Sequence, residues 1–420
     1  MTLTAAITSY DLWTIAIAAA CAVACAVPGC FLVLRRMSLL GDAISHSVLP
    51  GIALAFIATN SRAPLPMFIG AAGFALLAAS LTSDLRRVGK VQEDAALGIV
   101  FTSLFAAGVL LLAVLPSGVD LDPSCVLYGV LEGAAYDTTW GVPRALLVLA
   151  PVALLNLTLV TIFYKELRLV CFDAALATAM GFSAGLLHYA IMLVVAATTV
   201  ASFEAVGSVL VVAMLIAPPA TARLLTDRLG LMIVLSALIA LACAVLGYTL
   251  ALLLDSTVSG MMASLALAFF GLAVAAAPRE GLVARSLRRR ALSARIARED
   301  VLALLYRAAE KNDPFLLHPP QEPRSPRFLR AARSLVRRGA IRASQDGRLH
   351  LTAQGEALAR ELIASHRLWE SYLARNLPLP LDHLHEPSER AEHFISPSVR
   401  ERLGRESNDR EDPHGRSIPS

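Results

Sequence analysis

Long apolar stretches separated by short polar breaks fill the first two thirds of the chain. Each is close to the length that a helix needs to cross a bilayer at a rise of about 1.5 Å per residue. The pattern predicts nine transmembrane helices, near 12–34, 40–59, 65–82, 94–115, 143–163, 185–203, 205–224, 231–253 and 258–277. The third stretch, at 65–82, is short, and the break near residue 204 is narrow. A re-entrant segment at either place would leave eight crossings.

The pattern changes after residue 277, where apolar positions become sparse and take helical or alternating spacing. Residues 298–313 and 326–339 have the spacing of amphipathic helices, and 341–352 resembles a small two-stranded wing. A long helical pattern follows from residue 353. The predicted fold class is therefore an all-α polytopic membrane protein with about 8–9 transmembrane helices, followed by a small winged-helix-like and helical domain.

Composition and charge support this division. Hydrophobic residues make up 56% of the 420, but residues 1–277 hold only 11 of the 37 Lys and Arg and 14 of the 33 Asp and Glu. All six cysteines also lie there, so the tail has no disulfide framework and fits a reducing compartment. The predicted domains are a transmembrane domain at 1–277, a basic linker at 278–297, a winged-helix-like region at 298–352, a helical region at 353–398, and a disordered tail at 399–420.

The basic residues between the apolar stretches predict the orientation. If nine helices cross, alternate loops hold Arg35 with Arg36, a group at 86–90, Lys165 with Arg168, and a pair at 223–228. The opposite loops hold only Arg62 and Arg144. Since Lys and Arg accumulate on the cytoplasmic side, we expect an N-terminus outside and a cytoplasmic tail. No cleavable signal peptide is expected, because the first apolar run lacks a basic region before it.

Two ionisable residues in the segment GDAISHSVLPG raise a question of chemistry. Asp42 and His46 are four residues apart, so on a helix they share one face, where a carboxylate and an imidazole can converge on one cation. Ionisable groups in a membrane are costly and usually have a partner or a task. The alternatives are a cation site and a hydrogen-bonded pair that only stabilises packing.

Four separated strings resemble the permease subunits of ABC importers for zinc, manganese and iron. The resemblance covers nearly all of residues 10–277 and implies that Asp42 and His46 are metal ligands on the translocation path. It implies a divalent metal as substrate, manganese first and zinc or iron next, and no permanently bound cofactor. The strings are LRRMSLLGDAISHSVLPGIALAF, EDAALGIVFTSLFAAGVLL, YKELRLVCFDAALATAMG and VGSVLVVAMLIAPPATARLLTDRL.

The third string resembles the helix through which such permeases dock on their ATPase. Phe172, Asp173, Ala177 and Gly181 match the recurring pattern, although an ordinary interfacial helix is the alternative. The chain has no GxxxxGK[ST] phosphate loop, so ATP hydrolysis would fall to a separate subunit. The implied partners are an ABC ATPase subunit, an extracytoplasmic metal-binding protein and a second permease chain, identical or not, in the inner (plasma) membrane.

The tail strings LTAQGEALARELIASHRLWESYLA and HEPSERAEHFIS resemble the metal-responsive repressors of the diphtheria-toxin-repressor and manganese-repressor family. The resemblance covers about 300–398 and implies a site for manganese or ferrous iron, which suit oxygen and imidazole ligands. A surface helix with ordinary ion pairs is the alternative. The implied ligands are His366, Glu370, His385, Glu389, Glu392 and His393.

Two departures from that repressor pattern affect function. Asp300 matches an acidic ligand of the first helix, but the second acid is replaced by Ala303. Four prolines within 319–326 oppose a helix before the basic helix near 326–337, so sequence-specific DNA binding is doubtful. The basic helix still carries arginines that suit contacts with phosphate groups. They are Arg327, Arg330, Arg333, Arg337 and Arg338.

Transport is therefore the predicted function, by a permease subunit of an ABC importer of divalent metal ions with a metal-sensing cytoplasmic tail. The alternative is a membrane-tethered, metal-responsive transcriptional regulator that uses its helices only as an anchor. Nine crossings with the full set of permease strings are more than an anchor needs.

Overall fold

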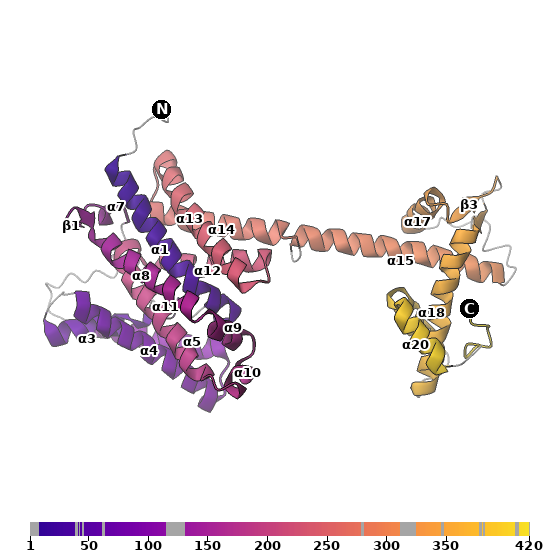
Figure 1. Cartoon of the computed structure of the whole chain (residues 1–420), viewed down its shortest axis with the longest axis horizontal. Helices are drawn as coiled ribbons and strands as arrows, with labels where there is room; N and C mark the ends of the chain where they lie inside the picture. Colours follow the sequence, from indigo (N-terminus) through magenta and orange to yellow (C-terminus); the bar gives the residue numbers. More distant parts are fainter. Residues whose placement is uncertain are drawn as a thin grey trace. The chain divides into compact units, whose positions relative to one another are not determined.

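A computed structural model of the chain describes residues 8–37, 41, 43, 46–60, 64–114, 131–278, 281–310, 325–345, 348–377, 380, 383–407 and 411–419. The chain forms two compact units, the membrane unit at 1–284 and the tail unit at 285–420. Both are built mainly from helices, and the described strands form two hairpins of two strands each (Figure 1). The predicted fold class, a polytopic helical membrane protein with a small winged-helix-like and helical domain, is confirmed.

Within the described ranges, eight helices are long and apolar enough to span a membrane. In the predicted segment 40–59, the described residues form the 11-residue helix Leu49–Thr59, and residues 41, 43, 46 and 47 before it are also helical. The elements of the membrane unit are α1 (Ser9–Leu34), α3 (Leu49–Thr59), α4 (Pro64–Gly89), α5 (Glu93–Val114), α7 (Leu131–Ala134), β1 (Thr138–Thr139), β2 (Val142–Pro143), α8 (Arg144–Ile162), α9 (Tyr164–Phe172), α10 (Ala174–Ala179), α11 (Ala184–Val206), α12 (Ser208–Leu225), α13 (Leu229–Leu254) and α14 (Val258–Ala276).

Helix α1 lies at the centre of this unit, in contact with α8, α11, α12 and α13 (Figure 1). Small residues allow the close packing, since Cys21, Ala22, Cys25 and the neighbouring alanines are fully buried. Gly29 is required here, because a Cβ on it would lie 2.1 Å from the carbonyl oxygen of Leu215 in α12. Small residues thus let the central helices approach each other closely.

The short helix α3 is held tightly by α4 and α5. A Cβ on Gly51 would lie 2.2 Å from the carbonyl oxygen of Gly70 in α4, and one on Gly108 in α5 would lie 2.8 Å from the nitrogen of Pro50. The backbones therefore approach as closely as glycine permits. This packing fixes the helix that directly follows His46.

The tail unit has its own core, formed by Val301, Leu302, Leu305, Leu335 and Ile341 with small residues around them. Strands β3 and β4 pair antiparallel, with Ile341 opposite Leu351, where the sequence predicted a wing. Thr352 caps the following helix through a hydrogen bond from the Gly355 amide. The elements are α15 (Leu282–Glu310), which begins in the membrane unit, α17 (Pro326–Arg337), β3 (Ile341–Ala343), β4 (Leu349–Leu351), α18 (Ala353–Asn376), α19 (His385–Ala391), the 3-10 helix η2 (Glu392–Phe394) and α20 (Pro397–Ser407).

Two segments differ from the sequence prediction. Residues 282–297, predicted as a linker, form the first half of α15, and the predicted disordered segment 399–420 contains most of α20. Buried Arg367 also donates hydrogen bonds to Glu310 and to the carbonyl oxygen of Ser417. Contacts between segments far apart in the sequence order the C-terminal residues, and local composition does not reveal such contacts.

Candidate metal sites and the coupling segment

His46 is half-buried in the membrane unit, between two aromatic rings of α5. Its ring centroid lies 5.9 Å from that of Phe101 and 5.4 Å from that of Phe105, the latter edge-on. The next residue, Ser47, is fully buried. Asp42 lies outside the described residues, so the pairing of Asp42 with His46 stays a prediction.

The predicted coupling residues lie at the junction of α9 and α10. Asp173 caps α10, since its Oδ1 accepts a hydrogen bond of 2.8 Å from the Leu176 amide. Ala177 is fully buried, and Gly181 has a φ of +90°, which favours glycine. These three residues therefore shape the turn and the short helix, while Phe172 is 61% exposed.

Two further apolar residues join Phe172 on the surface of this segment. Leu176 is 48% exposed and Met180 is 61% exposed, and both follow Phe172 at intervals of four residues. Leu176 in α10 and Met180 at its C-cap are four residues apart and lie on one face of that short helix. Phe172 ends α9, and the extended backbone of Asp173 separates it from α10. We call these three exposed apolar side chains the stripe. The recurring family positions include only Phe172 of the three, so the pattern did not predict Leu176 or Met180.

In the tail unit, α18 carries His366 and Glu370 one turn apart. Both side chains are buried, with exposed fractions of 4% and 2%, because α19, η2 and α20 cover this face of α18. His385, the first residue of α19, reaches the same point and is 46% exposed. We call His366, Glu370 and His385 the tail triad.

The donor atoms of the tail triad are close together. Nε2 of His366 lies 3.2 Å from Oε1 of Glu370 and 3.2 Å from Nδ1 of His385, and the last two atoms are 2.9 Å apart. Burial would raise the pKa of Glu370, but hydrogen bonding to His366 and His385 lowers it to about 2. The carboxylate is therefore ionised at neutral pH, as a metal ligand must be.

Glu392 lies on the other side of the His366 ring. Its Oε2 is 2.6 Å from Nδ1 of His366, and both side chains are buried. Burial would lower the pKa of His366, but Glu370 and Glu392 raise it. A carboxylate on the second nitrogen of a ligand histidine fixes its tautomer and orientation. Glu392 was predicted as a direct ligand, and its position instead suits orientation of His366.

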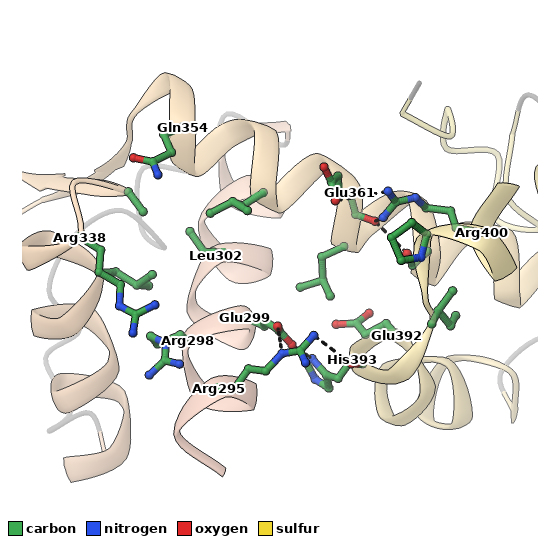
Figure 2. A pocket seen from close by; sticks show the side chains of 17 residues that line it. Arg295, Arg298, Glu299, Leu302, Arg338, Gln354, Glu361, Glu392, His393 and Arg400 are labelled. Carbon is green, nitrogen blue, oxygen red and sulfur yellow. Dashed lines mark hydrogen bonds and ion pairs between the residues drawn. The ribbon is translucent and has the colours of Figure 1, made fainter. Parts of the chain in front are cut away.

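His393 points away from the tail triad toward α15. Its Nδ1 lies 2.8 Å from Oε2 of Glu299, and its Nε2 lies 3.2 Å from Oδ1 of Asp300 (Figure 2 draws His393 and Glu299). Hydrogen bonds with Asp300 and Glu299 raise the pKa of His393 to about 9. Burial would raise the pKa of Glu299, yet hydrogen bonds from His393 and Arg295 lower it. Glu299 had no match in the repressor pattern, so the sequence analysis missed it.

Glu389 has a cationic partner on α15. Arg307 lies 3.1 Å from Oε1 of Glu389 and 3.8 Å from Oε2 of Glu392. These residues, with Asp300, Ala303 and His393, line a cavity of about 560 Å³. Of the six predicted ligands, the structure brings three together in the tail triad. The guanidinium of Arg307 pairs with the Glu389 carboxylate and lies near Glu392. It is therefore close to the position at which a metal ion would bind both carboxylates.

The tail triad fits a divalent metal. Adjacent donors at about 2.1 Å from one ion are separated by roughly 3 Å, close to the spacing of these three atoms. Among the described residues, the tail triad is the one group of three or more His, Cys, Asp or Glu residues whose donor atoms all lie within 4.8 Å of one another. Two imidazoles with a carboxylate suit manganese, ferrous iron or zinc. The exposed edge of His385 leaves a path for entry.

Comparison with known proteins gives one family match in the membrane unit and another in the tail unit. Residues 9–277 match the ABC 3 transport family, and residues 352–420 match the iron dependent repressor, metal binding and dimerisation domain. The manganese transport system membrane protein MntD of Bacillus subtilis is 46% identical over 285 residues, covering 67% of this chain and 96% of its own length.

Two other relatives extend the comparison. The zinc transport system membrane protein TroD of Treponema pallidum is 38% identical over 359 residues, covering 82% of this chain and 96% of its own. That alignment is longer than the membrane unit and therefore continues into the tail. The solved structure of PsaBC from Streptococcus pneumoniae in complex with Fab has a TM-score of 0.57 at 32% identity, over 67% of this chain and 96% of that one. The chain is a multi-pass membrane protein that belongs to the ABC 3 transport family, with a repressor-like domain at its C-terminus.

Proposed function

We propose that the chain is the permease subunit of an importer that carries a divalent metal ion, manganese first and zinc or iron next, across the inner membrane. This proposal rests on the similarity to membrane proteins of manganese and zinc transport systems, which extends over 96% of the length of each relative. His46 supports it as an imidazole inside the membrane unit, where a passing cation needs polar ligands. Asp42 and His46 would supply one oxygen and one nitrogen, few enough for the ion to leave again.

The exposed stripe of Phe172, Leu176 and Met180 is the proposed docking face for a separate ABC ATPase. Asp173 and Gly181 would set the shape of the segment, while the three apolar side chains would insert into the ATPase surface. An extracytoplasmic metal-binding protein and a second permease chain, identical or not, complete the proposed assembly. The chain itself has no phosphate-loop sequence, so the permease purified alone should hydrolyse no ATP.

The proposed orientation places the tail in the cytoplasm. The basic residues between helices alternate as expected for an N-terminus outside, provided that α3 and the residues before it cross the membrane once. In that orientation the tail triad samples cytoplasmic metal. Metal binding would join α18 to α19. If the tail unit has two arrangements, metal would favour the one that binds it more tightly, by an amount set by the difference between the two affinities. The proposed outcome is slower import when metal is abundant.

Metal uptake into proteoliposomes that contain the complete transporter tests this function. Replacement of His46 by Ala, or of Asp42 by Ala, should abolish manganese uptake while the ATPase still copurifies. Ser103→Ala on exposed α5 is a matched control, because this hydroxyl bonds only within its own helix in the described part of the chain. Normal uptake by both variants would remove the pair from the translocation path.

The tail is tested in the same assay by adding metal to the internal face. The double substitution His366→Ala and His385→Ala should leave the initial uptake rate unchanged and abolish its inhibition by internal manganese. The substitution Arg402→Ala, on exposed α20, serves as the control. Equal inhibition of the double variant and the control would show that the tail triad does not sense metal.

A further inference from the structure

A groove of about 640 Å³ runs between α15 and α17 in the tail unit. Its floor consists of small residues at helical spacing on the two helices, Ala294 and Ala297 on one and Ala331 on the other. Because these side chains are short, the helices leave space between them. Figure 2 shows the same α15 from the side of the neighbouring cavity.

The rim of the groove is strongly cationic. Five arginines line it, and no aspartate or glutamate does so among the residues that the structure describes. Ser293 and Ser334 add two hydroxyl donors. A guanidinium presents a planar fork of donors that matches a phosphate oxygen pair. The arginines are Arg289, Arg290, Arg298, Arg327 and Arg330.

Arg298 also lines the neighbouring cavity of about 480 Å³, together with Arg338. Figure 2 labels both arginines among the side chains that line that cavity. Three glutamates, Glu299, Glu361 and Glu392, also line it, so the surface without acidic residues is confined to the groove.

The covalent link limits how far the first arginine of the groove can lie from the last candidate membrane span. α14, a candidate membrane span, ends at Ala276, and Arg289 follows 13 residues later. Even a fully extended segment of that length reaches only about 45 Å. Exposed Leu287, Leu292 and Leu329 lie on the same two helices as the arginines. Exposed leucines beside arginines are typical of helices that lie at a membrane surface.

We infer that this groove binds the phosphate groups of anionic phospholipid headgroups at the surface of the bilayer that the chain spans. Duplex DNA has the same charge, but a helix-turn-helix reader needs a helix before its recognition helix. Here three prolines at 319–323 precede α17, whose first residue is a fourth proline, and they oppose that helix. The covalent link to the membrane and the exposed leucines favour the lipid. The inference does not depend on which ion is transported.

Hydrogen exchange of the full-length protein in nanodiscs tests the inference. Amides of 285–300 and 326–338 should exchange more slowly in phosphatidylcholine nanodiscs that contain about one third phosphatidylglycerol than in phosphatidylcholine alone. The protection should vanish in about 1 M salt, where the screening length is short. Each arginine should contribute roughly fivefold to headgroup affinity. The fourfold variant R289Q, R290Q, R327Q and R330Q should therefore lose the protection.

A matched variant removes the same charge elsewhere in the tail unit. R360Q, R390Q, R402Q and R405Q alter exposed arginines that pair with acids on their own helices and lie outside the groove, and this variant should keep the protection. Unchanged exchange of α18 in both variants shows that the tail unit stays folded. Equal exchange in the two lipids would overturn the inference. Protection in phosphatidylcholine nanodiscs by added duplex DNA or by inorganic phosphate, without an effect of phosphatidylglycerol, would also overturn it.

Discussion

Nδ1 of His366 and Oε2 of Glu392 are 2.6 Å apart, and both side chains are buried. His366 lies in α18 and Glu392 in η2, so the contact joins these two packed helices. It leaves Nε2 of the same ring facing Glu370 and His385. The His366 ring is thus held by a carboxylate at one nitrogen and offers the other to the tail triad.

Glu392→Gln should weaken manganese binding by the tail about 10- to 100-fold, the usual effect of losing a carboxylate that orients a ligand histidine. Competition with a fluorescent chelator, on the full-length protein in detergent, measures this. Glu370→Gln should have a larger effect, because it removes a ligand. Glu386→Gln, an exposed residue paired with Arg390, should leave affinity unchanged. An unchanged affinity for Glu392→Gln would assign Glu392 no part in the site.

Arg307→Gln should increase the number of metal ions bound to the tail. In the wild type, the guanidinium neutralises Glu389 and lies near Glu392, and its removal leaves two carboxylates beside a cavity that also contains His393. An ion can then take the place of the side-chain cation. Equilibrium dialysis followed by metal analysis should show an additional ion in Arg307→Gln but not in Arg307→Lys. Equal stoichiometry in all three proteins would contradict this role of Arg307.

The stability of the metal-free tail unit should fall between pH 6.5 and 9. The unfolded pKa of histidine is about 6.5, and the Asp300 and Glu299 carboxylates raise the folded pKa of His393 to about 9. The folded state therefore binds the proton more tightly, so the contribution is complete below about pH 6.5 and is lost as pH rises through 9. It amounts to roughly 2–3 kcal/mol, since each pKa unit is worth about 1.4 kcal/mol and Asp300 is exposed to solvent.

Thermal unfolding followed by the fluorescence of Trp369, with Trp13 and Trp140 replaced by Phe, measures this dependence. His393→Gln should flatten it. If the wild-type midpoint is the same at pH 6 and pH 9, the ion pairs of His393 do not stabilise the tail unit.

Leu176→Asp should abolish copurification with the ATPase, because it places a charge in the middle of the proposed docking stripe. Asp173→Ala removes a cap and should destabilise α10 by about 1 kcal/mol, with a smaller loss of ATPase binding. Asp173→Asn keeps a capping oxygen and should behave as wild type. Full ATPase binding by Leu176→Asp would place the docking surface elsewhere.

Local patterns were sufficient to predict most of the membrane unit and to place two of the three tail-triad residues together. Apolar length predicted the spans, and the four-residue spacing of His366 and Glu370 placed both on one face of α18. The contribution of His385 depends on how α19 packs on α18. Glu299 and Arg307 come from α15, far away in the sequence. Such contacts arise from packing between helices, which residue spacing along one helix does not encode.

The cationic groove and the partners of His393 share one helix, α15. Arg298 in α15 lines the groove, and its neighbour Glu299 bonds to His393. A ligand that shifts α15 at the groove would act on η2 through this bond, and a shift of η2 would act on α15 in the same way. Any factor by which anionic lipid changes the metal affinity must equal the factor by which metal changes the lipid affinity. Under this reciprocity, the tail would report metal supply and the charge of the surrounding membrane as a single coupled signal.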